Sequence, residues 1–152
     1  MKVDKIIALI KERVGSNSEL PGWKSHKKMA VIPINSITEK AFIPPKDAKQ
    51  ASVSIILFEE NNQLFFLLTK RTDNVEHHKG QVSLPGGAID KNETAQNASL
   101  RETKEEIGID SSSLKSLGQL SSLYTPVSYF NIKMSEITSK ATTAKNILFL
   151  CS

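Results

Sequence analysis

Three glutamates stand close together in the segment RETKEEIG, residues 101–108. In a helix, which turns by about 100° per residue, Glu102, Glu105 and Glu106 share one face. Like charges at this spacing repel, and Gly108 predicts a helix end that places the acids at the negative end of the dipole. Carboxylates grouped in this way form the oxygen site that Mg²⁺ or Mn²⁺ prefers, and such an ion can offset phosphate charge and activate water. The simpler alternative is an acidic helix face that meets only solvent.

The glutamates belong to a helix that we expect from about Thr94 to Ile107. Thr94 is a suitable N-cap because its hydroxyl can accept a bond from a free N–H of the first turn. Arg101 stands four residues before Glu105 and is expected to pair with it. The face expected to dock on a sheet is formed by Leu100, Thr103 and Ile107. The small residues expected to lie on the acids' side and leave room for a ligand are Ala95, Ala98 and Ser99.

The segment GAIDKNETAQNASLRETKEEIGI, residues 87–109, resembles the Nudix box. In that pattern a Gly is followed after five residues by Glu, and after seven more by Arg-Glu-aliphatic-any-Glu-Glu-any-Gly-aliphatic. The residues in register are Gly87, Glu93, Arg101, Glu102, Glu105, Glu106, Gly108 and Ile109. Thr103 departs from the pattern, because it stands where an aliphatic residue is usual. So many fixed positions over so short a segment make the resemblance specific.

The resemblance implies a Nudix hydrolase that cleaves a nucleoside diphosphate linkage with Mg²⁺ or Mn²⁺. The implied metal ligands are Glu102, Glu105, Glu106 and the carbonyl of Gly87. The implied catalytic residues are Glu102, Glu105 and Arg101, with Glu102 as the base toward water. Glu93 and Arg101 would form an ion pair that braces the helix to its loop.

The stretch before the box, residues 67–87, is similar to a second signature, that of coenzyme A pyrophosphatases within the Nudix family. Coenzyme A would then be cleaved to 3',5'-ADP and 4'-phosphopantetheine. The implied substrate-binding residues are Arg71, His78, Lys79, Gly80 and Gly86. Basic side chains suit a substrate with several phosphates. The chain departs from this signature at Thr72, Glu76 and Leu84.

Two alternatives stay open. One is a Nudix hydrolase for another nucleotide, such as ADP-ribose, NADH or a dinucleoside polyphosphate. The other is a truncated Nudix module without catalytic activity, which the atypical tail of residues 133–152 favours. Further strands and a helix are expected after the box, so truncation would leave the sheet incomplete, although NILFL (residues 146–150) is strand-like and could partly fill it.

The helices and strands expected around the site indicate a mixed α/β (α+β) fold. The resemblance implies a Nudix α/β/α sandwich around a mixed sheet. Residues 51–60 and 63–71 are expected to form a hairpin through Asn61 and Asn62. Residues 3–14 have helical periodicity. We expect a short strand at QVSL, a sharp turn at PGG (residues 85–87), and two later strands in LKSLGQLSSLY and YFNIKM. The expected division is residues 1–50 as a helix and extended segment, with MAVIPI as an edge piece, and residues 51–152 as the Nudix domain.

Composition limits the other functions that the chain could have. The net charge of +4 divides into +5 over residues 1–50, −4 over residues 51–110 and +3 over the rest. The acidic excess therefore lies around the glutamates, and no nucleic-acid-binding motif accompanies the basic flanks. The only long apolar run near the start, IIALI, is too short for a membrane span or a signal peptide. We expect a cytoplasmic protein with a small nucleotide as its partner and without nucleic acid or membrane partners; a homodimer is left open.

Overall fold

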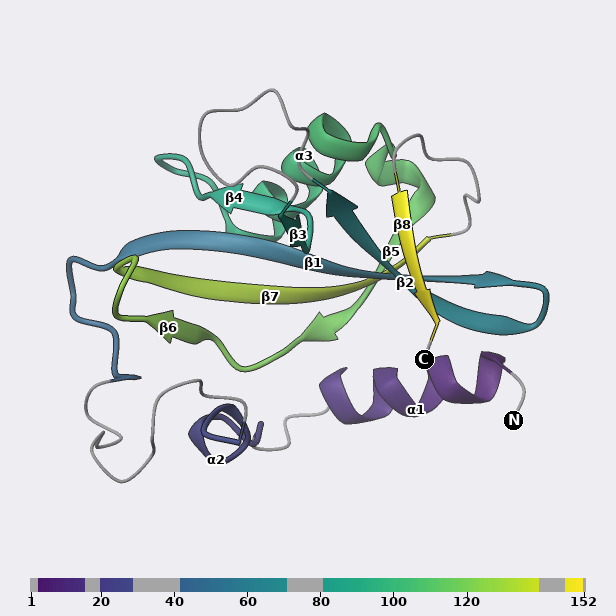
Figure 1. Ribbon diagram of the computed structural model, residues 1–152, viewed down its shortest axis with the longest axis horizontal. Helices are drawn as coiled ribbons and strands as arrows, with labels where there is room; N and C mark the ends of the chain where they lie inside the picture. The colour runs from purple at the N-terminus through teal and green to yellow at the C-terminus, as the bar shows by residue number, and fades with distance from the viewer. Residues whose placement is uncertain (1–2, 16–19, 29–41, 71–80, 140–146, 152) are drawn as a thin grey trace.

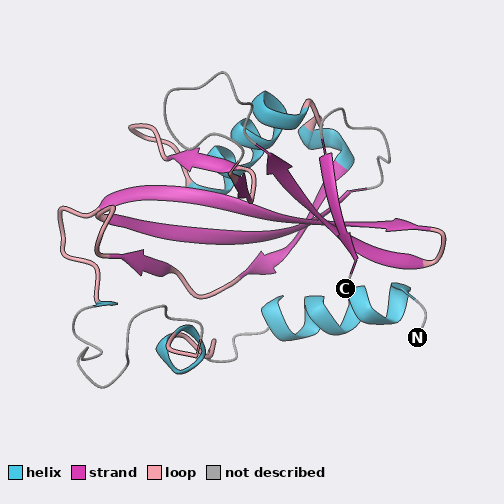
Figure 2. Cartoon of the chain, viewed as in Figure 1, coloured by secondary structure: helices cyan, strands magenta, loops and turns pink. Residues whose placement is uncertain are grey.

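A mixed sheet with helices on both sides organises the chain (Figures 1 and 2). The computed structural model describes residues 3–15, 20–28, 42–70, 81–139 and 147–151. Its helices are α1 (Val3–Gly15), α2 (Trp23–His26), α3 (Ala95–Ile107) and the 3₁₀ turn η3 (Ser111–Ser113). Its strands are β1 (Lys49–Glu60), β2 (Gln63–Lys70), β3 (Val82–Ser83), β4 (Gly86–Ala88), β5 (Leu114–Gln119), β6 (Leu123–Thr125), β7 (Phe130–Ser139) and β8 (Ile147–Cys151).

The sheet runs in the order β3-β2-β1-β7-β5, with β4 paired to β1, β6 to β7 and β8 to β2. The long strands β1 and β7 are parallel, and the other pairs are antiparallel. Helix α3 lies over one face of this sheet, whereas α1 lies on the opposite face against β5 (Figure 1). The mixed α+β architecture predicted from the sequence is confirmed.

The hairpin between β1 and β2 is confirmed, and its turn explains the pair of asparagines. Asn61 and Asn62 have φ angles of 50° and 61°. Two successive residues with positive φ are the requirement of a type I′ turn, and asparagine tolerates this region better than most residues. The turn sets the register in which Glu60 faces Gln63 and Phe58 faces Phe65.

The apolar core lies beneath the C-terminal end of α3. It consists of five buried side chains, with Phe65 and Leu114 packed against them: Ile56, Phe58, Leu67, Ile107 and Ile109. Phe58 and Phe65 stack with ring centroids 5.5 Å apart. This cluster joins the β1–β2 hairpin to the end of α3, and so fixes the end of the helix that carries the glutamates.

Several local expectations need correction. The segment PGG does not form a free turn, because Gly86 and Gly87 enter strand β4, which pairs with residues 51–53 of β1. The run LKSLGQLSSLY forms two strands, β5 and β6, rather than one. Residues 23–26, expected to be extended, form the short helix α2. MAVIPI lies outside the described residues.

Residues 147–150 of the segment NILFL lie in a strand, as expected: β8 pairs antiparallel with β2. In the described part of the chain, no helix is both long and apolar enough to cross a membrane.

Candidate active site on helix α3

Helix α3 carries the three glutamates, and both of its ends are fixed by local sequence. At the start, Thr94 Oγ1 accepts a hydrogen bond from the backbone N–H of Asn97 at 3.2 Å. At the end, Gly108 has a φ of 74° and its N–H donates to the carbonyl of Lys104 at 2.9 Å. A left-handed residue after the last turn is the usual place for glycine. The predicted N-cap and helix end are therefore confirmed.

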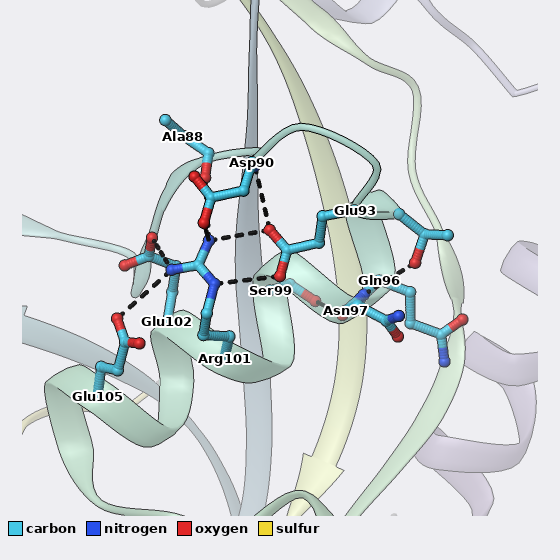
Figure 3. Close-up of polar contacts among 10 residues, drawn as sticks. Ala88, Asp90, Glu93, Gln96, Asn97, Ser99, Arg101, Glu102 and Glu105 are labelled. Atoms are coloured by element: carbon cyan, nitrogen blue, oxygen red, sulfur yellow. Dashed lines mark hydrogen bonds and ion pairs between the residues drawn. The ribbon is translucent and has the colours of Figure 1, made fainter.

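Arg101 ties the helix to the loop in front of it (Figure 3). Its Nε donates to Glu93 Oε1 at 3.1 Å and its Nη2 donates to Glu93 Oε2 at 3.0 Å. This two-pronged contact uses the planar fork of the guanidinium. Nη2 also donates to the carbonyl of Ala88 at 3.1 Å, and the backbone N–H of Asp90 donates to Glu93 at 3.2 Å. Arg101 thus links α3, the end of β4 and the loop that follows it.

The remaining nitrogen of Arg101 lies between two of the glutamates. Nη1 donates to Glu102 Oε1 at 2.8 Å and to Glu105 Oε2 at 3.4 Å (Figure 3). The contact with Glu105 has the spacing expected from the sequence. The shorter contact with Glu102 joins adjacent residues, and reasoning from helical spacing did not find it because neighbours in a helix do not face each other.

These contacts change the acidity of the groups involved. The hydrogen bond from Arg101 is the main cause that lowers the pKa of Glu93 below its ordinary value. In return, Glu93 first and Glu102 second raise the pKa of Arg101. The Arg101 guanidinium is therefore a permanent positive charge within the acidic cluster.

The carboxylate of Glu102 lies directly over strand β4. A Cβ added to Gly87 would collide with Glu102 Oε1, and it would lie 2.6 Å from Glu102 Cδ. Glycine at position 87 therefore makes space for this carboxylate, and it brings a backbone segment close to it. The predicted metal ligands Glu102 and Gly87 lie side by side in the structure.

Ala98 and Ser99 of α3 do not leave room for a ligand, contrary to our expectation. Ala98 and Ser99 are fully buried against the sheet, together with Thr103. Ser99 contacts Ser54 of β1 through its backbone carbonyl. These small residues let the helix approach β1 closely. The acidic face of the helix starts only at Glu102. Leu100, expected on the docking face, is only partly buried.

A cavity of about 450 Å³ opens beside the site. It is lined by Glu106 from α3, Gly86 from β4, and residues of β1, β2 and the β3 region: Val53, Thr69, Lys70, Gln81, Ser83 and Leu84. Gln81 was not among the residues predicted to bind substrate, whereas Lys70 begins the basic stretch that was expected to suit a substrate with several phosphates. Lys70 directly precedes Arg71, so the sequence shows two adjacent basic residues. That Lys70 borders the cavity follows only from the folded structure.

The other predicted substrate-binding residues, Arg71, His78, Lys79 and Gly80, lie outside the described residues. Among the residues that are described, no three acidic, histidine or cysteine side chains converge on a point that could hold a metal ion. In this conformation Glu102 and Glu105 are directed to Arg101 instead.

Comparison with known proteins now identifies the family. Residues 48–145 match the model of the NUDIX domain, and the chain therefore belongs to the Nudix family. Nudix hydrolase 3 of Caenorhabditis elegans is 36% identical over 107 residues, which are 70% of this chain and 44% of that protein. The Nudix hydrolase NudL of Klebsiella aerogenes is 38% identical over 78 residues, 51% of this chain and 64% of the relative. The chain thus spans less than two thirds of the length of these relatives.

Solved structures agree on the fold. The Ap4A hydrolase of C. elegans superposes with a TM-score of 0.58 at 19% identity, covering 68% of this chain and 80% of that one. A NUDIX hydrolase from Nitrosomonas europaea gives a TM-score of 0.54 at 20% identity, covering 80% and 65%. At these identities the likeness concerns the arrangement of sheet and helices alone.

Proposed function

We propose that the protein is a divalent-metal-dependent hydrolase that cleaves the diphosphate linkage of a nucleotide derivative. The observation that carries this proposal is the position of Glu106, which lines a cavity that also has Lys70 on its wall. A cation and a carboxylate beside one cavity suit a phosphate that must be attracted and then attacked by water.

The donor set fits a hard divalent cation such as Mg²⁺ or Mn²⁺. Three carboxylates and one backbone carbonyl are oxygen donors, which these ions prefer. The space at Gly87, which a side chain would fill, lets Glu102 lie close to the backbone. The residues that would hold the ion are Glu102, Glu105, Glu106 and the carbonyl of Gly87. When bound, the ion would supply charge neutralisation for the phosphates and acidify a water.

Each side chain of the site would have a separate role in the reaction. Glu102 would accept a proton on its carboxylate from the water that attacks phosphorus. Arg101 would keep Glu102 and Glu105 oriented, as its Nη1 does in the structure, and Glu93 would hold Arg101. Lys70 would attract the phosphates from the cavity wall, with Arg71, His78, Lys79 and Gly80 of the following segment as further phosphate contacts.

Coenzyme A is the substrate that we propose first, with 3',5'-ADP and 4'-phosphopantetheine as products. The support is the stretch before the box, where residues 67–87 follow the coenzyme A pyrophosphatase signature. Glu76 and Leu84 replace a usual Arg and Phe of that signature, and this favours a second candidate, another nucleotide such as ADP-ribose, NADH or a dinucleoside polyphosphate. We also propose a cytoplasmic location, with a homodimer as an arrangement to be tested.

A panel of substrates tests this function. The purified chain is incubated with Mn²⁺ or Mg²⁺ and with coenzyme A, ADP-ribose, NADH or diadenosine polyphosphates. The products are separated by chromatography and identified by mass spectrometry. Preferred cleavage of coenzyme A supports the first candidate, and cleavage of another member alone replaces it with the second. A protein that melts cooperatively but cleaves none of them contradicts the catalytic proposal and favours a non-catalytic Nudix module.

A further inference from the structure

The layer between helix α3 and strand β1 is polar where an apolar contact would be expected. Four fully buried hydroxyl side chains are gathered there, two from the strand and two from the helix: Ser52, Ser54, Ser99 and Thr103. Buried hydroxyls without partners are destabilising, and even well-bonded ones add little net stability over apolar side chains of the same shape. A role other than stability therefore has to be considered for this layer.

Three of these residues are joined by hydrogen-bond contacts, two of which cross the layer and one of which lies within α3. Thr103 Oγ1 donates to the carbonyl of Ser99 at 2.7 Å, and Ser54 Oγ donates to the same carbonyl at 3.3 Å. Thr103 Oγ1 also lies within hydrogen-bond distance of Ser54 Oγ, at 3.2 Å. Hydrogen bonds depend on direction, whereas apolar packing does not. The set therefore fixes both the height of α3 above β1 and its rotation about its own axis.

The rotation of α3 matters because Glu102 directly precedes Thr103. The carboxylate of Glu102 occupies the space where Gly87 would carry a Cβ. Gly87 pairs with Ser52 of β1, two residues from Ser54. One strand thus carries both the hydroxyl that holds the helix and the pairing that places Gly87 under Glu102.

We propose that Ser54 and Thr103 are positioning residues: the buried contacts of the Ser54 hydroxyl with the Ser99 carbonyl and with Thr103 Oγ1 orient α3 so that the Glu102 carboxylate lies over Gly87. The consequence for metal binding rests on the proposed function, whereas the geometry itself does not. Substitutions at residues that orient metal ligands typically weaken metal affinity or activity by about 10- to 100-fold.

The test compares two variants that each remove one hydroxyl with a third variant that keeps the hydroxyl. Thr103→Val removes the hydroxyl of the helix, Ser54→Ala removes that of the strand, and Thr103→Ser restores a hydroxyl without the methyl group. Thr125→Val is the matched control, since Thr125 Oγ1 also bonds a serine hydroxyl and a backbone carbonyl, but on β6, which pairs with the other edge of β7.

Two readouts are measured on each variant after thermal melting has shown that it folds. The first is the amide signal of Gly87 in a ¹H–¹⁵N spectrum of the metal-free protein. The second is the Kd for Mn²⁺ by titration calorimetry, with kcat and KM for the substrate that the panel identifies.

We expect Thr103→Val and Ser54→Ala to move the Gly87 signal and to raise the Kd for Mn²⁺ about tenfold. Thr103→Ser should restore both, and Thr125→Val should change neither. An unmoved Gly87 signal in Thr103→Val, with or without a lower melting temperature, overturns the positioning role. Failure of the wild-type protein to bind Mn²⁺ would contradict the proposed function instead, and the Gly87 signal would still decide the inference.

Discussion

Arg101 gives the acidic cluster a positive charge from within the chain. Its guanidinium lies within 4 Å of four carboxylates, those of Asp90, Glu93, Glu102 and Glu105. The repulsion among glutamates that the sequence suggests is therefore reduced before any ion binds. A metal ion would have to compete with Arg101 for Glu102 and Glu105, so its affinity depends on how firmly Glu93 holds the same guanidinium.

At this scale we predict the consequences of changing Glu102 or Glu106 to glutamine. Glu102→Gln and Glu106→Gln should each lower kcat at least about 100-fold, because a proton acceptor or a metal ligand is lost. Glu102→Gln should also lower the melting temperature, since it weakens the 2.8 Å charge-assisted contact with Arg101. Steady-state kinetics and thermal melts measure both effects.

Glu59→Gln is the control for these two variants, because Glu59 is an exposed residue near the end of β1. It should leave both readouts as in the wild type. Full activity in Glu102→Gln would remove Glu102 from the role of base.

Asp110 provides a prediction of pH dependence. The backbone N–H of Ser112 first, and Lys104 next, lower the pKa of this carboxyl from 3.8 to about 2. A lowered pKa in the folded state gives stability that is present above the unfolded pKa and is lost as the pH falls through the folded pKa. Asp110→Asn should therefore be less stable than the wild type at pH 7, and the difference should vanish between about pH 4 and pH 2.

Urea denaturation at pH 7, 4, 3 and 2.5 measures that difference. Asparagine is as good an N-cap as aspartate, so the substitution tests the charge rather than the cap. A stability difference that persists unchanged at pH 2.5 would show that the charge of Asp110 is not its source.

At the scale of elements, strand β4 joins the site to the sheet through two glycines with different surroundings. A Cβ on Gly86 would meet backbone, colliding with the Ser52 carbonyl and lying 2.7 Å from Val53 Cα. A Cβ on Gly87 would meet the end of the Glu102 side chain, which can move. The first glycine is thus needed for strand pairing, and the second for the position of a carboxylate.

We predict that Gly86→Ala lowers the free energy of unfolding by about 3 kcal/mol or more, because backbone must shift. Gly87→Ala should have a smaller effect on stability but should weaken Mn²⁺ binding, since Glu102 is displaced. Urea denaturation and titration calorimetry separate the two outcomes. If Gly86→Ala and Gly87→Ala lost equal stability, the Glu102 side chain would be as rigid as the backbone, and the proposed difference between the two glycines would be wrong.

The difference between β4 and α3 shows what the sequence could predict. The cap at Thr94, the end at Gly108 and the turn at Asn61 and Asn62 depend on residues a few positions apart, and all were predicted. The pairing of β4 with β1 joins residues more than thirty positions apart, and PGG on its own is typical of a turn. The burial of Ser99 likewise depends on residues far apart in the sequence, because only the approach of β1 decides which face of the helix meets the sheet.

At the scale of the whole molecule, the two faces of the sheet are covered by different helices, and only one face carries the candidate site. Helix α3 and its carboxylates lie on one face, and α1 covers β5 on the other (Figure 1). The junction of α1 with β5 is tight at Gly118, where a Cβ would lie 2.5 Å from Val14 Cγ1 and 3.0 Å from the Val14 carbonyl oxygen. If the faces are independent, a defect at this junction should reduce stability without changing the site.

We predict that Gly118→Ala lowers the free energy of unfolding by about 1–3 kcal/mol, because the added methyl group overpacks the junction. Hydrogen exchange of α1 should become faster, while the Kd for Mn²⁺ should stay within about twofold of the wild type. Gly15→Ala is the matched control, since its Cβ would lie 3.6 Å from the Leu117 carbonyl oxygen, an ordinary contact. A loss of Mn²⁺ affinity in Gly118→Ala would show instead that the docking of α1 is transmitted through the sheet to Glu102.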